Sequence, residues 1–188
     1  MEKNRFLLDK KKQLSKKDSS NIGSWDKKIA GLCNKINKKK NYYTTSSCSG
    51  RIVLLKYSDK KIADAFLFRN HGKVSFDLLK KELNRISKEY SGLVEFQMTS
   101  CIMHVACREI SDAFLIVNKS RECGWKRSGV MGNKRNICEL HSTENMSFPV
   151  MDEGEMMVDD EYLKLVLGIA NSKLVRVWKK IDRLKGII

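Results

Sequence analysis

The chain has 188 residues, a length typical of one domain, and carries 37 Lys and Arg against 22 Asp and Glu, a net charge of +15. Such an excess attracts polyanions at long range and releases their counterions on contact, so nucleic acid is the leading candidate partner. A lysine-rich surface without a polyanionic partner is the alternative, because charge alone specifies neither fold nor site.

The apolar segments and the cysteines indicate in which cellular compartment the protein works. The longest apolar stretches are shorter than the roughly 18 residues of a membrane helix. The N-terminus has no charged-then-apolar export signal. The six cysteines form no CxxC pair and no close framework. We therefore expect a cytoplasmic protein with reduced cysteines and no membrane insertion.

The segment 1–40 is the most basic part of the chain and is predicted to be helical. An apolar stripe at helical spacing runs through it, formed by Trp25, Ile29, Leu32, Cys33 and Ile36. The helix should dock by this stripe and expose its lysines. The run Lys38, Lys39 and Lys40 ends the segment and is a candidate RNA-binding cluster.

The remainder alternates strand and helix patterns. In chain order the pattern predicts strands at 42–45, 52–57 and 63–69, a helix at 75–90, and strands at 93–99 and 102–108. A helix from Ser111 to Cys123 should end at Gly124, followed by strands at 137–142 and 147–150 and a closing helix from Asp160. The buried side of the closing helix is predicted from Tyr162, Val166, Ile169, Val177, Ile181 and Leu184.

These elements indicate an α/β (α+β) fold in which largely antiparallel strand pairs alternate with helices and a long C-terminal helix closes the chain. Two strand-pair-plus-helix units follow one another, without evident residue similarity between them. The single proline and the lack of Gly/Ser-rich linkers favour one domain over 1–188. No GxGxxG, GxxxxGK[ST], HExxH or GxSxG motif is present, so a Rossmann fold is not expected.

The most unusual local feature is a loop of small polar residues between Thr44 and Arg51. It contains Ser46, Ser47, Cys48, Ser49 and Gly50. Backbone N–H groups of such a loop can converge on an anion, and the arginine adds bidentate charge-assisted bonds. A plain hairpin turn is the alternative interpretation.

Histidines and tyrosines supply further candidates. His71, His104 and His141 lie at or near predicted strand ends, where they can face a cleft; a structural role is the alternative. No metal site is expected, because His104 and Cys107 would point to opposite faces of a strand.

Aromatic residues beside basic ones could stack RNA bases. Tyr42, Tyr43 and Trp125 have such neighbours, whereas the phase of Trp25 places it in the core. Core packing is the alternative for at least one of the tyrosines.

Motifs in order along the chain resemble the tRNA wybutosine-synthesizing protein 3 family. They are Asp18-x-Ser20-x-x-Gly23-x-x-Asp26, the run from Tyr43 to Arg51, His71, His104-Val105-x-Cys107-Arg108, Ser128-Gly129, Ser142-Thr143, Glu161-Tyr162-Leu163 and Asn171. They extend over most of the chain. One departure is His141, where the family pattern leads us to expect an arginine.

The resemblance implies a methyltransferase that uses S-adenosylmethionine to methylate a ring nitrogen of a tricyclic 4-demethylwyosine-type guanosine, next to the anticodon of phenylalanine tRNA. His104 or Asp26 would accept the proton, and Arg51 would contact a phosphate or the donor's carboxylate. Cys48 would be a small packing residue, since direct methyl transfer needs no nucleophile. The residues that the resemblance gathers around donor and base are Ser46, Ser47, Ser49, Gly50, Arg51, His71, Arg108, Ser128, Gly129 and Ser142.

Two functions of other classes compete with this one. The first is a non-catalytic basic RNA-binding or assembly module, in which the N-terminal helix grips the RNA backbone. It predicts RNA binding without methyl transfer. The second is a metal-dependent hydrolase, which predicts bound metal.

Overall fold

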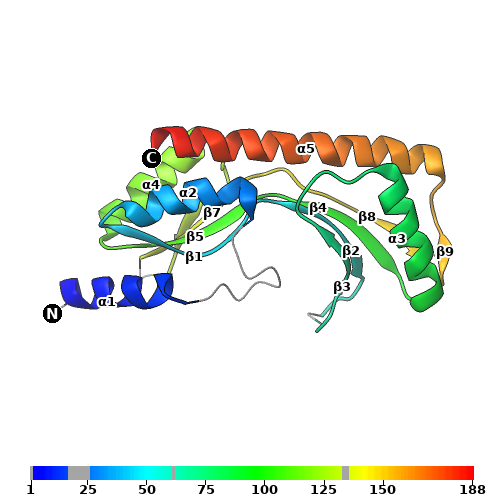
Figure 1. Ribbon diagram of the computed structural model, residues 1–188, viewed down its shortest axis with the longest axis horizontal. Helices are drawn as coiled ribbons and strands as arrows, with labels where there is room; N and C mark the ends of the chain where they lie inside the picture. The colour runs from blue at the N-terminus through cyan, green and yellow to red at the C-terminus, as the bar shows by residue number, and fades with distance from the viewer. Residues whose placement is uncertain (1, 17–25, 61, 133–135) are drawn as a thin grey trace. The chain divides into compact units, whose positions relative to one another are not determined.

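The computed structural model describes residues 2–16, 26–60, 62–132 and 136–188 (Figure 1). Trp25, which was predicted to lie in the core, and the family-pattern residues Asp18, Ser20 and Gly23 fall outside these ranges. The chain forms two compact units. Unit 1 comprises Met1–Ser49, Cys101–Thr143 and Val177–Ile188, and unit 2 comprises Gly50–Ser100 and Glu144–Arg176.

Unit 1 is built on a four-stranded antiparallel sheet in the order β1-β5-β7-β6. The strands are β1 (Tyr42–Cys48), β5 (Ile102–Cys107), β7 (Ile137–His141) and β6 (Gly129–Met131). Helices α2 (Lys27–Lys38) and α4 (Ile110–Glu122) cover one face, and α1 (Glu2–Leu14) lies against the other (Figure 1). One sheet face thus packs into a core, while the other stays open beside α1.

The apolar stripe of α2 explains its place on the sheet. Ile29, Leu32, Cys33 and Ile36 are all fully buried, which confirms the spacing argument, and each large aliphatic side chain so buried contributes about 1.5–3 kcal/mol. Asn37 Oδ1 accepts the backbone N–H of Thr44 at 2.8 Å, which ties α2 to β1. The lysines of α2 are left exposed, as predicted.

Unit 2 contains a five-stranded antiparallel sheet in the order β3-β2-β4-β8-β9. The strands are β2 (Arg51–Lys56), β3 (Phe66–Asn70), β4 (Val94–Thr99), β8 (Met146–Asp152) and β9 (Glu155–Met156). Helix α3 (Phe76–Glu89) begins at Ser75, whose Oγ accepts the N–H of Leu78 at 3.3 Å. Helix α5 (Asp160–Ile187) supplies residues to unit 2 up to Arg176 and to unit 1 from Val177.

The predicted fold class is confirmed: the strands are antiparallel, helices alternate with them, and a long helix ends the chain. A single domain over 1–188 stays a prediction. The predicted pairing of 93–99 with 102–108 is wrong, because β4 and β5 belong to different sheets, as do β1 and β2, whereas the sequence neighbours β2 and β3 do pair. Residues 46–51 are therefore not a hairpin turn.

Two details of the helices also differ from the prediction. Helix α4 is capped by Glu109 rather than begun at Ser111, because Glu109 and Asp112 form a capping box. Its end at Gly124, with φ of 91°, is confirmed. On α5, Tyr162 and Ile169 are 43% and 40% exposed instead of buried. No helix in the described ranges is both long and apolar enough to cross a membrane.

Candidate active site

A row of polar side chains crosses the open face of the unit 1 sheet. Ser46 is paired with His104, and His104 is paired with Glu139. Paired residues of an antiparallel sheet point to the same face, so the three side chains form one line over β1, β5 and β7. Gly129 pairs with Glu139 and ends the row, and a Cβ added there would meet nothing within 4 Å. The row therefore has open space at its β6 end.

A β-bulge decides which residue of β1 enters the row. Thr44 pairs with Val105, and after a register shift Ser46 pairs with His104. Without the extra residue, Thr45 would stand opposite His104 and Ser46 would point into the core, because side chains alternate along a strand.

Hydrogen bonds join the row from end to end. Ser46 Oγ lies 2.7 Å from His104 Nδ1, and His104 Nε2 lies 3.1 Å from Glu139 Oε2. A carboxylate can only accept hydrogen bonds, so this geometry suits the imidazole tautomer that carries its hydrogen on Nε2, in which Nδ1 is free to accept the Ser46 hydroxyl. The histidine side chain is 26% exposed and the glutamate 30%. The arrangement presents a hydroxyl to solvent with a base behind it.

His141 lies beside this row on the same strand as Glu139, and its Nδ1 is 3.9 Å from Glu139 Oε1. Burial lowers the pKa of His141; Glu139 raises it, while Arg127 and His104 lower it further, and the net direction is down. The imidazole is thus kept neutral near pH 7. The arginine expected at this position would instead carry a fixed charge.

Asp26 precedes α2 and fixes the end of β1. Its Oδ2 accepts the backbone N–H of Ser49 at 2.8 Å, while its side chain makes no cap hydrogen bond to α2. The carboxylate is thus engaged by the backbone, an arrangement that suits positioning better than proton transfer. Ser49 itself is fully buried, and its Oγ has no hydrogen-bond partner among the residues that the structure describes.

The other predicted serines of unit 1 support the strands. Ser47 points toward α2, where its Oγ accepts the Cys33 thiol at 3.4 Å. Ser128 is buried, donates to Trp125 O at 2.6 Å and accepts the N–H of His141 at 3.1 Å. Ser142 is also fully buried. Ser128 and Ser142 therefore lie inside the unit rather than on its open face.

The predicted aromatic platforms are enclosed. Tyr42 is 9% exposed and donates its hydroxyl to Asp112 O at 3.3 Å; burial, and then Asp112, raises the pKa of Tyr42 to about 12. Tyr43 is 8% exposed and its ring centroid lies 5.2 Å from that of Phe6. Trp125 is fully buried. Rings so enclosed offer no face to an RNA base, which contradicts the stacking role expected of them.

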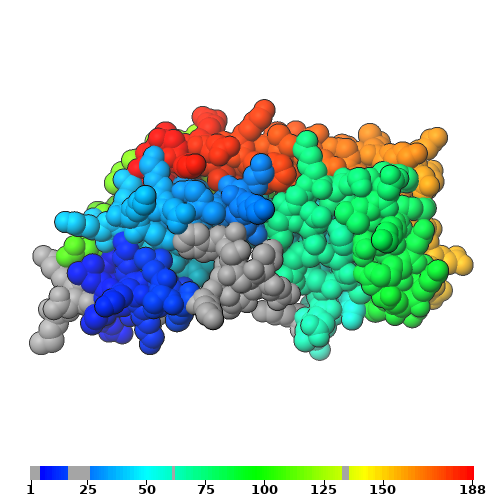
Figure 2. Space-filling model, viewed as in Figure 1, coloured from blue at the N-terminus to red at the C-terminus, as the bar shows by residue number. Residues whose placement is uncertain are grey.

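Lys38, Lys39 and Lys40 are exposed, at the turn between α2 and β1. Figure 2 shows the side chains of α1 and α2 together on the surface of unit 1, and Lys10 of α1 donates to the carbonyl of Lys39. The predicted lysine cluster is thus open to solvent, and α1 adds a further lysine beside it.

The structure does not bring Arg108 to the row. It follows β5, and its backbone N–H donates to Asn41 O at 2.9 Å. Four residues along an extended strand separate it from His104, a distance of about 13 Å.

The remaining predicted residues belong to unit 2. Gly50 has φ of 90°, and an added Cβ would lie 3.0 Å from Thr99 O, so only glycine fits there. The guanidinium of Arg51 lies 4.8 Å from the centre of the Phe66 ring. His71 is half-buried just after β3.

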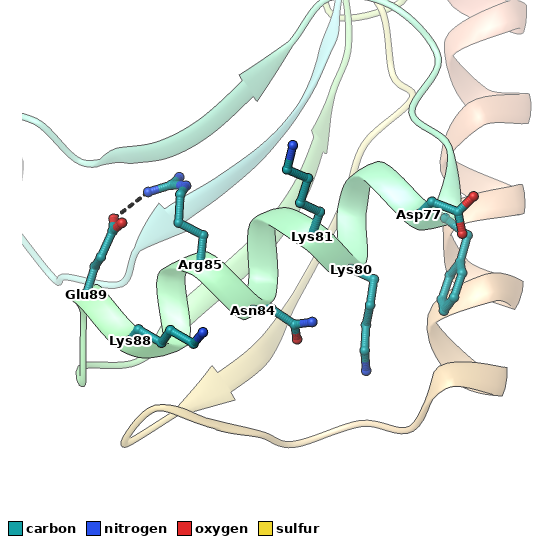
Figure 3. A pocket seen from close by; sticks show the side chains of 8 residues that line it. Asp77, Lys80, Lys81, Asn84, Arg85, Lys88 and Glu89 are labelled. Carbon is teal, nitrogen blue, oxygen red and sulfur yellow. Dashed lines mark hydrogen bonds and ion pairs between the residues drawn. The ribbon is translucent and has the colours of Figure 1, made fainter.

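A surface hollow of about 610 Å³ lies along α3, and none of the predicted site residues lines it. Its lining includes Lys80, Lys81, Asn84, Arg85 and Lys88. Figure 3 shows Arg85 turned toward Glu89, with which it is paired at 2.5 Å. Lys80 is likewise paired, with Asp160. These internal pairs compensate part of the positive charge of the hollow.

Sequence reasoning missed Glu139, although a signal was present. Ile137, Glu139 and His141 alternate along a predicted strand, which places a carboxylate and an imidazole on one face. Phe66 and Arg69 were also missed, because their side chains come together only through an irregularity in the pairing of β3 with β2.

The chain is a non-Rossmann α/β protein with two antiparallel sheets, a large cationic excess and a hydrogen-bonded Ser–His–Glu row. The family model described as Methyltransferase TYW3 matches residues 2–188, and the chain belongs to this family. The resemblance inferred from the motifs is thereby confirmed.

Named relatives match over most of their lengths. A Thermococcus sibiricus protein named tRNA(Phe) 7-((3-amino-3-carboxypropyl)-4-demethylwyosine(37)-N(4))-methyltransferase is 37% identical, over 100% of this chain and 95% of its own. A Methanocaldococcus jannaschii protein of the same name is 35% identical, over 96% and 98%. A Pongo abelii protein named tRNA wybutosine-synthesizing protein 3 homolog is 29% identical, over 90% of this chain and 67% of its own.

Solved structures share the fold. A protein from Pyrococcus horikoshii superposes with a TM-score of 0.85 at 34% identity, over 98% of this chain and 94% of its own. An Aeropyrum pernix protein gives a TM-score of 0.75 at 25% identity, over 86% and 96%.

Proposed function

We propose that this protein transfers a methyl group from S-adenosylmethionine to N4 of a 4-demethylwyosine-type base beside the anticodon of phenylalanine tRNA. The printed names of the relatives support the substrate and the methylated atom. The observation that carries the proposal is the hydrogen-bonded row of Ser46, His104 and Glu139, since N-methylation needs a group that takes up a proton.

The polar side chains of the site are chemically suited to this methyl donor. S-Adenosylmethionine has a carboxylate, an ammonium group and ribose hydroxyls, all of which form hydrogen bonds with serine. The buried Ser49 Oγ lacks a partner in the described part of the chain, and such a group costs about 1–3 kcal/mol unless a partner is supplied. When bound, the donor supplies an electrophilic methyl group whose bond to sulfur breaks as the bond to nitrogen forms.

The row moves the proton that the acceptor nitrogen loses. The base N–H donates to Ser46 Oγ, the serine passes its own proton to Nδ1 of His104, and the imidazole becomes positively charged. Glu139 already holds Nε2–H and stabilises that charge. Asp26 and the strand end at Ser49 keep β1 in place. Because positioning supplies much of the rate in such reactions, the protein needs only this modest acid–base contribution.

The test is a methyl-transfer assay with labelled S-adenosylmethionine and phenylalanine tRNA that carries the 4-demethylated tricycle. We expect label in the tRNA with the wild-type protein and a kcat lower by about 10²–10⁴ for His104→Gln, with unchanged tRNA binding. Glu155→Gln, at an exposed carboxylate of β9, is the matched control and should have wild-type turnover. Absence of label while tRNA still binds would favour the non-catalytic binding module instead.

We also propose that the protein acts in the cytoplasm. All six cysteines are free thiols, the state that a reducing compartment maintains.

A further inference from the structure

One face of the unit 2 sheet carries an aromatic ring, Phe66, with the guanidinium groups of two arginines near it. The guanidinium of Arg69 lies 3.9 Å from the centre of the Phe66 ring, and that of Arg51, from the neighbouring strand β2, lies 4.8 Å from it. A register shift makes this possible: Leu54 pairs with Phe68 but Leu55 pairs with Phe66. The extra residue in β3 puts Phe66 and Arg69 on one face, although residues three apart normally point to opposite faces.

This face is the one opposite α5. On the other face the rings of Phe96 and Phe148 stack at 5.0 Å, and Phe148 meets Tyr162 of α5 at 5.8 Å. Leu54, paired with Phe96, is fully buried on that side. Phe66 by contrast is 39% exposed. A partly open aromatic ring on a sheet face is not explained by core packing.

The two arginines carry uncompensated charge. Within the described residues no carboxylate forms an ion pair with Arg51 or Arg69, and Arg51 Nε is buried without a hydrogen-bond partner there. A guanidinium that stacks on a ring by its flat face keeps its in-plane N–H groups for another acceptor, and phosphate is the acceptor that its geometry matches.

We propose that Arg51, Phe66 and Arg69 bind a single-stranded segment of RNA, with one base stacked on the exposed part of the Phe66 ring and the adjoining phosphates held by the two arginines. Stacking requires a base whose face is free, which a loop offers and a duplex does not. The net charge of +15 favours such a polyanion. The identification of the RNA as an anticodon loop rests on the proposed function. Binding of this loop requires no methyl donor.

The experiment measures binding of an unmodified anticodon stem-loop of phenylalanine tRNA, with 2-aminopurine replacing each loop purine in turn. The wild-type protein should quench one probe position by stacking. Phe66→Leu should bind roughly five- to hundredfold more weakly and lose the quenching, with an unchanged salt dependence. Arg69→Gln should lower the slope of log affinity against log salt by about 0.7, the value for one phosphate of a single strand.

Matched control variants distinguish the loss of this site from a general loss of RNA binding. Phe66→Tyr keeps an aromatic ring and should retain binding and quenching. Phe114→Leu, at a 56% exposed phenylalanine of α4, and Arg176→Gln, at an exposed arginine of α5, should stay within about twofold of wild type.

Three results would overturn the proposal: wild-type affinity in both Phe66→Leu and Arg69→Gln, equal losses of binding to the stem-loop and to a duplex of the same length, or quenching that persists in Phe66→Leu. A protein that binds and quenches but transfers no methyl group would instead contradict the proposed function alone.

Discussion

Replacing Glu139 by glutamine tests whether the row acts as one proton acceptor. The change keeps the shape of the side chain but removes the negative charge that lies 3.1 Å from His104 Nε2. With charge centres about 4 Å apart, the Coulomb energy is about 1 kcal/mol in water and about 4 kcal/mol at an effective dielectric constant near 20. Because the glutamate and histidine side chains are 30% and 26% exposed, we expect about 2 kcal/mol, or roughly a 30-fold loss in kcat.

The assay is single-turnover methyl transfer in a double-mutant cycle of Glu139→Gln and His104→Gln. If the glutamate acts only through the imidazole, Glu139→Gln should cost less than about twofold once His104 is already glutamine. The KM for tRNA should stay unchanged in all four proteins, because in the proposed mechanism the base contacts Ser46, and His104 and Glu139 lie behind it. Additive losses in the double variant, or a change confined to KM, would refute the proton-acceptor role.

Three further predictions concern surface charge and titrating groups. Changing the Lys38–Lys40 run to alanine should weaken tRNA binding and reduce its salt slope by up to about 2.7 for three phosphate contacts; an unchanged slope would mean that the run faces away from RNA. Tyr42 ionises near pH 10 when unfolded but near 12 when folded, so stability should fall as pH rises between these values, and denaturant unfolding of Tyr42→Phe should lose that dependence. Because burial lowers the pKa of His141, the unfolded chain takes up this proton first, and stability should fall as pH drops below about 6.5. His141→Gln should flatten that acid limb, and a limb as steep as in the wild type would assign the loss to other groups.

The positions of α2 and α3 followed from the sequence because each of these two helices buries a regular apolar stripe. The 3.6-residue spacing of Ile29, Leu32 and Ile36 predicts the buried side of α2, and that of Leu79, Leu83 and Ile86 predicts the buried side of α3. Exposure on α5 was harder to predict, since Tyr162 and Ile169 are apolar in type yet remain exposed. A charged or polar residue is rarely buried, but an apolar residue can be either buried or exposed, because the surfaces of folded proteins keep many apolar atoms.

The site was less predictable because its side chains are brought together by strand irregularities and by the pairing of strands that are distant in the sequence. The bulge at Thr45 turns Ser46 toward His104, and the extra residue in β3 brings Phe66 beside Arg69. Neither leaves a distinct pattern in the letters of the sequence. Strand pairing across distant segments is also invisible to local periodicity, so Glu139 could be placed on a strand but not beside His104.

We propose that the row of Ser46, His104 and Glu139 takes up the proton released when a tRNA base is methylated. Mass spectrometry of nucleosides from phenylalanine tRNA, incubated with S-adenosylmethionine and either wild-type protein or His104→Gln, tests it most directly. We expect one added methyl group on N4 of the tricycle with the wild type, and almost none with His104→Gln, which should still bind tRNA. Equal methylation by both proteins, or none by a wild type that binds the tRNA, would contradict it.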